Sequence, residues 1–349
     1  MPRIGLVGVG FMGWIHYLAY QKTPGVRLAA ISTRDPQRLA GDWRGIQGNF
    51  GPPGEQVDLT GVARYADWRA LIADPEVDVV DICLPPYLHA EVAVAASQAG
   101  KHVFCEKPLA LQEAECERMV QAARTANRQL YTGHVLPFLP EYAVARAMQA
   151  AGNYGKLLGG HFRRVISDPQ WLPDFYHAAR VGGPLLDLHV HDAHFIRLLF
   201  GMPSSVASVG RLRGETVEYC ESQFAFADRQ LVVSATSGVI AQQGRPFLHG
   251  FEMHWEQATL SFEFAVLGEG LAPQQNPLTL FTADGKITHP ELPAGDAMLN
   301  AFAAEIAEVV KCAERNESSP LLGGDLARDA IRLCHYQSTA VKTRAPVVC

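Results

Sequence analysis

The chain lacks a long apolar run, paired cysteine motifs and any strong excess of charge. No apolar run approaches the roughly 20 residues that a membrane-spanning helix needs. The 349 residues carry a formal net charge of -6 at pH 7, which argues against a nucleic-acid partner. The seven cysteines are scattered without Cys-x-x-Cys spacing. They predict reduced thiols in a cytoplasmic protein, with neither a zinc ribbon nor a disulfide framework.

The length exceeds that of one ordinary core, so we expect two domains. Residues 1–133 alternate strand and helix patterns with continuous apolar strands, which is typical of a parallel sheet covered on both faces. In residues 134–349 strand-like runs follow one another with turn residues between them, which predicts an antiparallel sheet beside helices. Because the first strand begins almost at once, we expect no signal peptide.

The expected elements follow the apolar periodicity and the turn residues. Strands are expected at 3–8, 27–32, 78–84, 102–105 and 129–133, then at 157–166, 205–212, 218–227, 231–239 and 258–264. Helices are expected at 12–21, 36–40, 67–73, 88–99, 111–127, 139–151, 184–200, 295–314 and 325–343. The Gly- and Pro-rich segment 41–61 interrupts the pattern and predicts a surface insertion.

A glycine-rich turn follows the first expected strand and precedes the first expected helix. Gly8 permits a tight turn, Gly10 leaves room for a pyrophosphate, and Gly13 lets the helix pack close to the strand. The exposed N–H groups and the positive end of the helix then bind phosphates. With Phe11 and Met12 between them, these glycines predict a dinucleotide-binding loop.

The end of the second expected strand bears on the choice of dinucleotide. An acidic residue about twenty positions after the glycines binds the ribose 2′-OH in NAD-binding folds, and this region carries Ser32, Thr33 and Arg34 instead. A hydroxyl and a guanidinium suit a 2′-phosphate, so NADP is favoured, with NAD as the alternative. Asp35 could serve as the acidic residue, but Asp35-Pro36 fits a helix N-cap better.

Two segments carry candidate catalytic groups. Lys107 follows a strand that ends in Glu-Lys-Pro, so it is expected at the carboxyl edge where ligands bind. There a lysine with a lowered pKa can relay a proton, although spacing alone would equally suit a solvated turn lysine. In the expected helix after Pro184, Asp187 and His191 are four apart and share a face. A carboxylate beside an imidazole can move a hydroxyl proton while hydride passes to or from a nicotinamide.

A histidine cluster in the same helix raises a metal hypothesis. Its members are His189, His191, Asp192 and His194, and zinc prefers such ligands. On a helix, however, His189 and His191 point about 200° apart. Nicotinamide hydride transfer needs no metal, and we assign none.

The motifs together resemble the glucose-fructose oxidoreductase / inositol dehydrogenase / rhizopine-catabolism (Gfo/Idh/MocA) family. The resemblance is carried by the segments at 8–13, 85–89, 100–108, 182–192 and 324–338. It implies a Rossmann N-terminal domain and a C-terminal α+β domain with an open, mainly antiparallel sheet that often mediates oligomer contacts. A homodimer or homotetramer and a sugar, polyol or cyclitol substrate are therefore expected.

The resemblance also implies residue roles. Lys107 would act near the reacting hydroxyl or carbonyl, Asp187 would bind substrate, and His191 would be the general acid/base. Five further residues belong to the predicted dinucleotide site: Leu84, Pro85, His89, Glu106 and Lys107.

Three departures put the substrate in doubt. His189 replaces a usual glycine, Pro137 stands where an arginine is common, and Tyr87 adds an aromatic side chain. Two alternatives to an ordinary dehydrogenase remain, because fold does not fix function: a dinucleotide-binding regulator, and a glycosidase-like member that retains NAD. The presence of Lys107 and His191 favours an enzyme over a regulator.

Overall fold

The chain forms two units, and neither is continuous in sequence. The computed structural model describes residues 1–268 and 270–349. The first unit comprises Met1–Leu139 and Ala294–Arg328, and the second comprises Pro140–Pro293 and Asp329–Cys349. A single boundary after residue 133 does not capture the return of residues 294–328 to the first unit. The apolar stripe of an amphipathic helix predicts that the helix packs against a sheet or another helix. It does not predict which of the two sheets that is.

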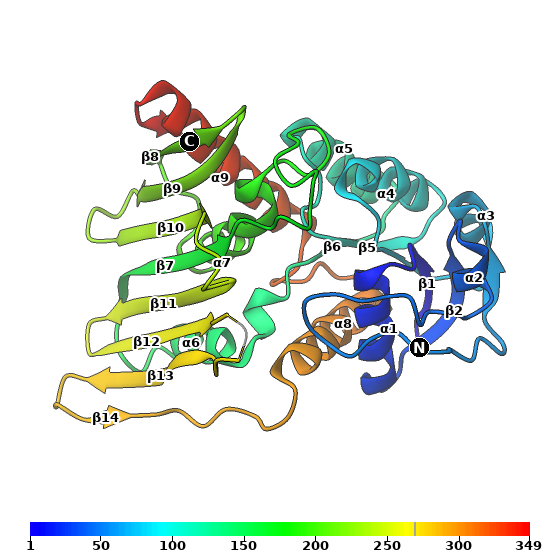
Figure 1. The fold of residues 1–349 in the computed structure, drawn as a ribbon, viewed down its shortest axis with the longest axis horizontal. Coiled ribbons are helices and arrows are strands. Elements are labelled where there is room, and N and C mark those ends of the chain that lie inside the picture. The colour runs from blue at the N-terminus through cyan, green and yellow to red at the C-terminus, as the bar shows by residue number, and fades with distance from the viewer. Residues whose placement is uncertain (269) are drawn as a thin grey trace. The chain divides into compact units, whose positions relative to one another are not determined.

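The first unit is built on a six-stranded sheet in the order β3-β2-β1-β4-β5-β6, with all neighbours parallel (Figure 1). This is the expected Rossmann sheet, in which β1 and β4 lie side by side at the point where the strand order reverses. The short strand β3 was not expected from the sequence. The strands are β1 Arg3–Val7, β2 Arg27–Ser32, β3 Ala63–Tyr65, β4 Val79–Ile82, β5 His102–Glu106 and β6 Leu130–Gly133.

Helices complete the first unit, and α8 packs beside α1. The helices and 3-10 turns are α1 Phe11–Lys22, α2 Pro36–Leu39, α3 Trp68–Ala73, η1 Pro86–Leu88, α4 His89–Gln98, α5 Glu113–Thr125, η2 Leu136–Phe138, α8 Ala297–Arg315 and the start of α9 Gly324–Thr343. Among the described residues, no helix combines the length and the apolar character needed to cross a bilayer.

The segment 41–61 is more than a surface insertion, because it packs aromatic side chains onto the first unit. Trp43 is fully buried, and its ring meets that of Trp14 edge to face at 6.0 Å. The ring of Phe50 stacks on Phe302 of α8 at 5.9 Å. Gly/Pro content correctly indicates irregular backbone here, but it does not reveal that the few aromatic residues contribute to a core.

The second unit contains the expected open, mainly antiparallel sheet, in the order β14-β13-β12-β11-β7-β10-β9-β8-β15. Only the central neighbours β7 and β10 are parallel. The strands are β7 Leu157–Ser167, β8 Ser205–Arg213, β9 Thr216–Ala225, β10 Val232–Ile240, β11 Phe247–Trp255, β12 Ala258–Val266, β13 Gln274–Thr282, β14 Ile287–Thr288 and β15 Val347–Val348.

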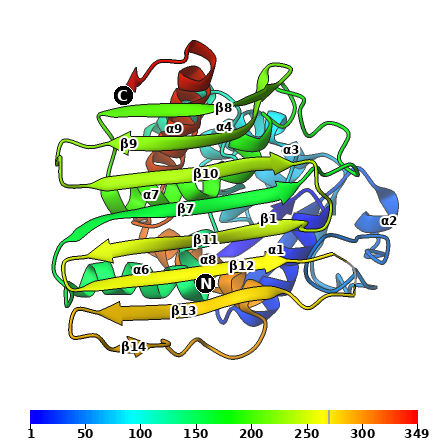
Figure 2. The same ribbon diagram turned by 60° about the vertical axis from the view of Figure 1, so that its left-hand side comes forward.

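Helices cover one face of this sheet, and in the described part of the chain no helix covers the other (Figure 2). They are α6 Pro140–Ala151, a π-helical turn η3 at Leu185–His189, α7 Val190–Phe200 and the greater part of α9. The expected single helix over 184–200 is therefore divided in two. π-turns are rare and are frequently found at functional sites.

A buried ion pair fastens α7 to the sheet. The Arg164 guanidinium on β7 binds the Asp192 carboxylate on α7 through two contacts, Nε to Oδ2 at 2.7 Å and Nη2 to Oδ1 at 3.1 Å. Both side chains are almost fully buried. Such a bidentate pair fixes the rotation of α7 about its axis, and so the direction in which its neighbouring side chains point.

This ion pair leads to a stability prediction. Arg164→Ala leaves the Asp192 carboxylate buried without its partner, so the free energy of unfolding should fall by about 3–5 kcal/mol. The matched control is the preceding residue, Arg163, whose pair with Glu263 is partly exposed. Arg163→Ala should cost only about 0–1 kcal/mol. Urea unfolding of both variants tests the difference, and equal losses would contradict it.

Candidate dinucleotide and catalytic site

The three glycines of the first turn are each required for a different geometric reason. Gly8 has φ +99°, and a Cβ there would lie 2.4 Å from the carbonyl oxygen of Cys83. A Cβ on Gly13 would lie 2.3 Å from the carbonyl oxygen of Gly8. A Cβ on Gly10 would meet no atom within 4 Å. The loop is therefore tight at its two ends and open in the middle.

The open part of the loop faces the start of α1. This helix begins at Phe11, has no acidic residue in its first turn, and no side chain caps its free N–H groups. The Gly8 N–H donates to the carbonyl of Ser32 at 2.9 Å, which ties the loop to the end of β2. An anion is the ligand that such a helix end favours. The residues present fit a dinucleotide pyrophosphate, as the sequence predicts.

The end of β2 agrees with the N-cap interpretation of Asp35. Its Oδ1 accepts hydrogen bonds from the N–H groups of Gln37 at 2.9 Å and Arg38 at 3.2 Å, and Pro36 begins α2. A carboxylate used in this way is already committed to the helix. Thr33 and Arg34 follow β2 directly, and Arg34 is exposed.

Arg38 is a residue of this region that the sequence analysis missed. Its Nη1 donates to the carbonyl of Val9 within the glycine loop at 2.8 Å, and its Nε lies 3.3 Å from Asp35 Oδ2. The guanidinium therefore lies beside the same loop as the predicted phosphate-binding N–H groups. Its position four residues after Arg34, on the helix that Asp35 caps, was the available signal.

His89 is expected from the sequence to contact the cofactor, and in the structure its ring contacts backbone carbonyls. Its ring is buried, with Nδ1 at 2.9 Å from the carbonyl oxygen of Pro108 and Nε2 at 2.7 Å from that of Leu84. Burial lowers the pKa of His89. The imidazole thus joins the loop after β4 to the turn after β5, and its nitrogens face backbone. Leu84 and Pro85 follow β4, and Leu84 lies next to Gly8.

Glu106 is the last residue of β5, and Lys107 follows it. The Glu106 carboxylate is buried, and its Oε2 accepts the backbone N–H of Lys107 at 3.0 Å while its Oε1 lies 3.0 Å from His16 Nε2. Both oxygens of Glu106 therefore contact protein groups, and its expected part in the cofactor site stays a prediction. Lys107 follows directly at the carboxyl edge of the sheet, where ligands of this fold bind.

In the second unit, Asp187 and His191 lie at the junction of the π-turn and α7. From residue 183 to 196, only Asp187, Leu188 and His191 are partly exposed, and every other residue is buried. The two candidate catalytic side chains therefore belong to the accessible side of an otherwise buried segment. The structure places them on the second unit and the other candidates on the first.

Asp192 of α7 and His189 of the π-turn are buried. Both oxygens of Asp192 bind Arg164, and burial lowers the pKa of His189 to about 4. In the part of the chain that the structure describes, the group of side chains with metal-ligand spacing is instead His16, Asp81 and Cys83 of the first unit.

Comparison with known proteins gives matches in both units. The model of an oxidoreductase family with an NAD-binding Rossmann fold matches residues 2–134, and that of the GFO/IDH/MocA C-terminal domain matches residues 142–261. A 1,5-anhydro-D-fructose reductase of Ensifer adhaerens is 31% identical over 252 residues, which are 68% of this chain and 71% of the relative.

Two further relatives match over shorter stretches. A levoglucosan dehydrogenase of Pseudarthrobacter phenanthrenivorans is 33% identical over 219 residues, 59% of this chain and 53% of the relative. A myo-inositol 2-dehydrogenase of Thermotoga maritima is 32% identical over 200 residues, 57% of this chain and 55% of the relative. These matches span about half the length of the two dehydrogenases.

Solved structures share the fold over nearly the whole chain. A levoglucosan dehydrogenase in complex with NADH and levoglucosan has a TM-score of 0.79 at 23% identity, covering 99% of each chain. An oxidoreductase domain protein from Kribbella flavida has a TM-score of 0.81 at 21% identity, covering 100% of this chain and 99% of the other.

The open middle of the glycine loop leads to a binding prediction. Gly10→Ala should leave the unfolding midpoint unchanged, because the added methyl meets no protein atom. It should weaken NADH and NADPH binding by at least about tenfold, which corresponds to roughly 1.4 kcal/mol of lost contact. Gly45→Ala, also in open space, is the control and should change neither property. Isothermal titration with each dinucleotide measures the effect; unaltered binding by Gly10→Ala would remove this loop from the phosphate site.

Proposed function

Because this chain belongs to the Gfo/Idh/MocA oxidoreductase family, we propose that it is an NAD(P)-dependent dehydrogenase or reductase. The reaction interconverts a hydroxyl group of a sugar, polyol or cyclitol and the corresponding ketone. The relatives named as dehydrogenases of levoglucosan and myo-inositol and as a reductase of 1,5-anhydro-D-fructose support this substrate class.

The observation that carries the proposal lies within the first unit. The open glycine loop at the end of β1 and Lys107 at the end of β5 share the carboxyl edge of one parallel sheet. Bound there, a nicotinamide supplies the hydride acceptor or donor. The N–H groups at the start of α1 would hold the pyrophosphate, and residues at the exits of β4 and β5 would contact the cofactor.

Three side chains take part in transferring the proton of the substrate hydroxyl group. The Lys107 ammonium donates a hydrogen bond to the reacting oxygen and stabilises negative charge that develops on it. The His191 imidazole takes the proton in the oxidation direction and returns it in the reduction direction. Asp187, four residues earlier on the same accessible side, orients that imidazole and binds substrate hydroxyls.

We infer NADP as the preferred cofactor. Thr33 and Arg34 stand where an NAD-specific carboxylate is usual, and the nearby carboxylate of Asp35 is committed to capping α2. Arg38 adds a second guanidinium beside the glycine loop. Hydroxyl and guanidinium groups favour a 2′-phosphate over a bare ribose.

The same reasoning extends to assembly. We infer a homodimer or homotetramer formed through the face of the nine-stranded sheet that no helix covers. Exposed apolar side chains on its strands, Val209 of β8 and Val232 of β10 among them, support this surface.

Removal of the proposed catalytic amine tests the enzyme. Lys107→Ala should reduce turnover by about 10²–10⁴-fold, the usual contribution of a proton-handling group, with dinucleotide affinity nearly unchanged. Lys286→Ala, which removes an exposed lysine, is the control. Steady-state kinetics over a panel of sugars, polyols and cyclitols measure the effect, and full activity of Lys107→Ala would refute the role.

Removal of the exposed arginine tests the cofactor. Arg34→Ala should weaken NADPH binding by about 10- to 100-fold, the loss of a charge-assisted hydrogen bond worth about 1.5–3 kcal/mol, and should leave NADH binding nearly unchanged. Arg44→Ala serves as the control because this residue pairs with Asp42 in the insertion. Calorimetric titration separates the outcomes: equal losses for both dinucleotides would mean that Arg34 does not recognise a 2′-phosphate.

A further inference from the structure

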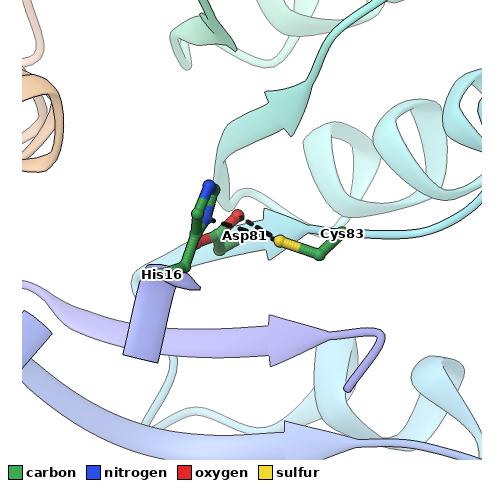
Figure 3. Close-up of side chains that lie close together, drawn as sticks. All are labelled: His16, Asp81 and Cys83. Carbon is green, nitrogen blue, oxygen red and sulfur yellow. Dashed lines mark hydrogen bonds and ion pairs between the residues drawn. The ribbon is translucent and has the colours of Figure 1, made fainter. Parts of the chain in front are cut away.

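A cluster of titratable side chains is sealed inside the first unit beneath the predicted dinucleotide loop. Its centre is His16 of α1, which is fully buried, as is Asp81 of β4. Cys83 follows β4, and its Sγ lies 3.4 Å from His16 Nδ1. Figure 3 shows the three side chains converging from the helix and the strand.

Both ring nitrogens of His16 face carboxylate oxygens. Nδ1 lies 2.7 Å from Asp81 Oδ2, and Nε2 lies 3.0 Å from Glu106 Oε1. The Tyr20 hydroxyl also donates to Asp81 Oδ2. A neutral imidazole has one N–H donor, whereas an imidazolium has two. Because a carboxylate oxygen faces each ring nitrogen, both nitrogens are placed to donate, which favours the imidazolium form of His16.

The electrostatic balance supports the same protonation state. Burial disfavours the imidazolium, but the contacts with Asp81 and Cys83 together outweigh burial and hold the pKa of His16 well above its ordinary value. The ring also stacks on the Phe104 ring, with centroids 5.3 Å apart. Because water does not reach the pair, the attraction is little screened.

The group of His16, Asp81 and Cys83 is better described as a hydrogen-bonded network than as a metal site. Ligands around a tetrahedral zinc ion at 2.0–2.1 Å would stand about 3.3 Å apart, whereas His16 Nδ1 and Asp81 Oδ2 are 2.7 Å apart. A metal would also need the Cys83 thiolate, and burial raises the pKa of that thiol. The short nitrogen–oxygen contact is that of a charge-assisted hydrogen bond.

We propose that His16, as an imidazolium between Asp81 and Glu106, is a positioning residue that links the dinucleotide loop to Lys107. The inference rests on the function proposed above. The link is continuous: α1 begins at the glycine loop, His16 projects from its second turn, and Glu106 holds the backbone N–H of Lys107 at 3.0 Å.

The backbone around Glu106 leaves it little freedom to move. A Cβ on Gly133 of β6 would lie 2.7 Å from Glu106 Oε1, so the carboxylate fills the space that a side chain at residue 133 would take. Held by His16 on one oxygen and by the Lys107 N–H on the other, Glu106 fixes the start of the turn after β5. A rigid turn is what a proton-handling lysine needs, because small displacements of a catalytic group are costly.

Glu305 of α8 lies beside the network as a neutral acid. It is fully buried, and neither of its oxygens has a hydrogen-bond partner among the described residues. Burial and the nearby Glu106 carboxylate raise its pKa well above the ordinary value. The titratable groups that act on it are Glu106 on β5, His16 on α1 and Asp81 on β4. Tyr20 and Cys83 contact Asp81 in turn. With one imidazolium and two carboxylates already buried, a third negative charge would be uncompensated, so Glu305 keeps its proton.

The protonation state of His16 is directly measurable without any substrate. In the full chain labelled with ¹⁵N-histidine, two-bond ¹H–¹⁵N spectra report each of the 13 histidine rings, and His16→Gln identifies the signal. We expect both nitrogens of His16 to be protonated at pH 8. His102, whose pKa burial lowers to about 4, provides a neutral ring in the same spectrum. One bare nitrogen on His16 at pH 8 would overturn the proposal.

Kinetics then separate positioning from simple destabilisation. His16→Gln should reduce kcat by about 10²-fold, the cost of a misplacement near 1 Å, and leave the dinucleotide Kd within about threefold, since the ring is buried away from ligand. His102→Gln, at the opposite end of β5, should leave kcat unchanged. Equal kcat in wild type and His16→Gln, with Lys107→Ala inactive, would refute the positioning role but not the function. No turnover in wild type on any substrate would refute the function, while the spectra would still decide the charge of His16.

The proton on Glu305 gives a stability test of opposite sign to that of an ordinary glutamate. A raised folded-state pKa contributes stability that is complete below the unfolded-state pKa and is lost as the pH rises above it. The melting temperature of Glu305→Gln relative to wild type should therefore increase from pH 5 to pH 8. In Glu308, hydrogen bonds from Ser319 and Cys312 together with the nearby Lys311 outweigh burial and lower the pKa. Glu308→Gln should therefore lose stability relative to wild type as the pH rises toward about 5, and the difference should stay nearly constant from about pH 5 to pH 8. A pH-independent difference for Glu305→Gln would mean that Glu305 is ionised in the folded chain.

Discussion

The close approach of α1 to the ends of β1 and β4 is the constraint on which the first unit depends. Two glycines allow it: Gly8, whose Cβ would collide with the carbonyl of Cys83, and Gly13, whose Cβ would collide with that of Gly8. The same approach that exposes N–H groups to a phosphate brings His16 within 2.7 Å of Asp81. Binding loop and buried network are thus two consequences of one tight turn.

Burying charge is costly, and both units keep their buried charges paired. In the first unit, His16 lies between two carboxylates, and Glu305 beside them is neutral. In the second unit, the pair of Arg164 and Asp192 joins sheet and helix next to His191. A well-packed apolar core would give equal or greater stability in both places. The ionic contacts instead fix orientation, because charged hydrogen bonds hold the elements that carry the proposed catalytic groups in one geometry.

Local patterns in the sequence were sufficient where the physics is local. The glycine turn, the alternation of strands and helices in the first unit, and the Asp35 cap each depend on residues within a few positions of one another. The π-turn before α7, the burial of Trp43 and the return of residues 294–328 to the first unit do not. Each of these depends on which distant surface a segment packs against, and hydrophobic periodicity does not specify that surface.

The same distinction between local and long-range contacts applies to the residues of the candidate site. The residue types of Gly10, Thr33, Arg34 and Lys107, and their positions at strand ends, were determined by the sequence alone, because strand polarity decides which side chains reach the carboxyl edge. Only the tertiary structure decided that His89 and Glu106 turn inward and that Arg38 reaches the glycine loop. It also joined His16, Asp81 and Glu305, which are separated by up to 289 residues in the chain. Contacts between side chains so far apart arise from the packing of helices on a sheet, and no local spacing encodes them.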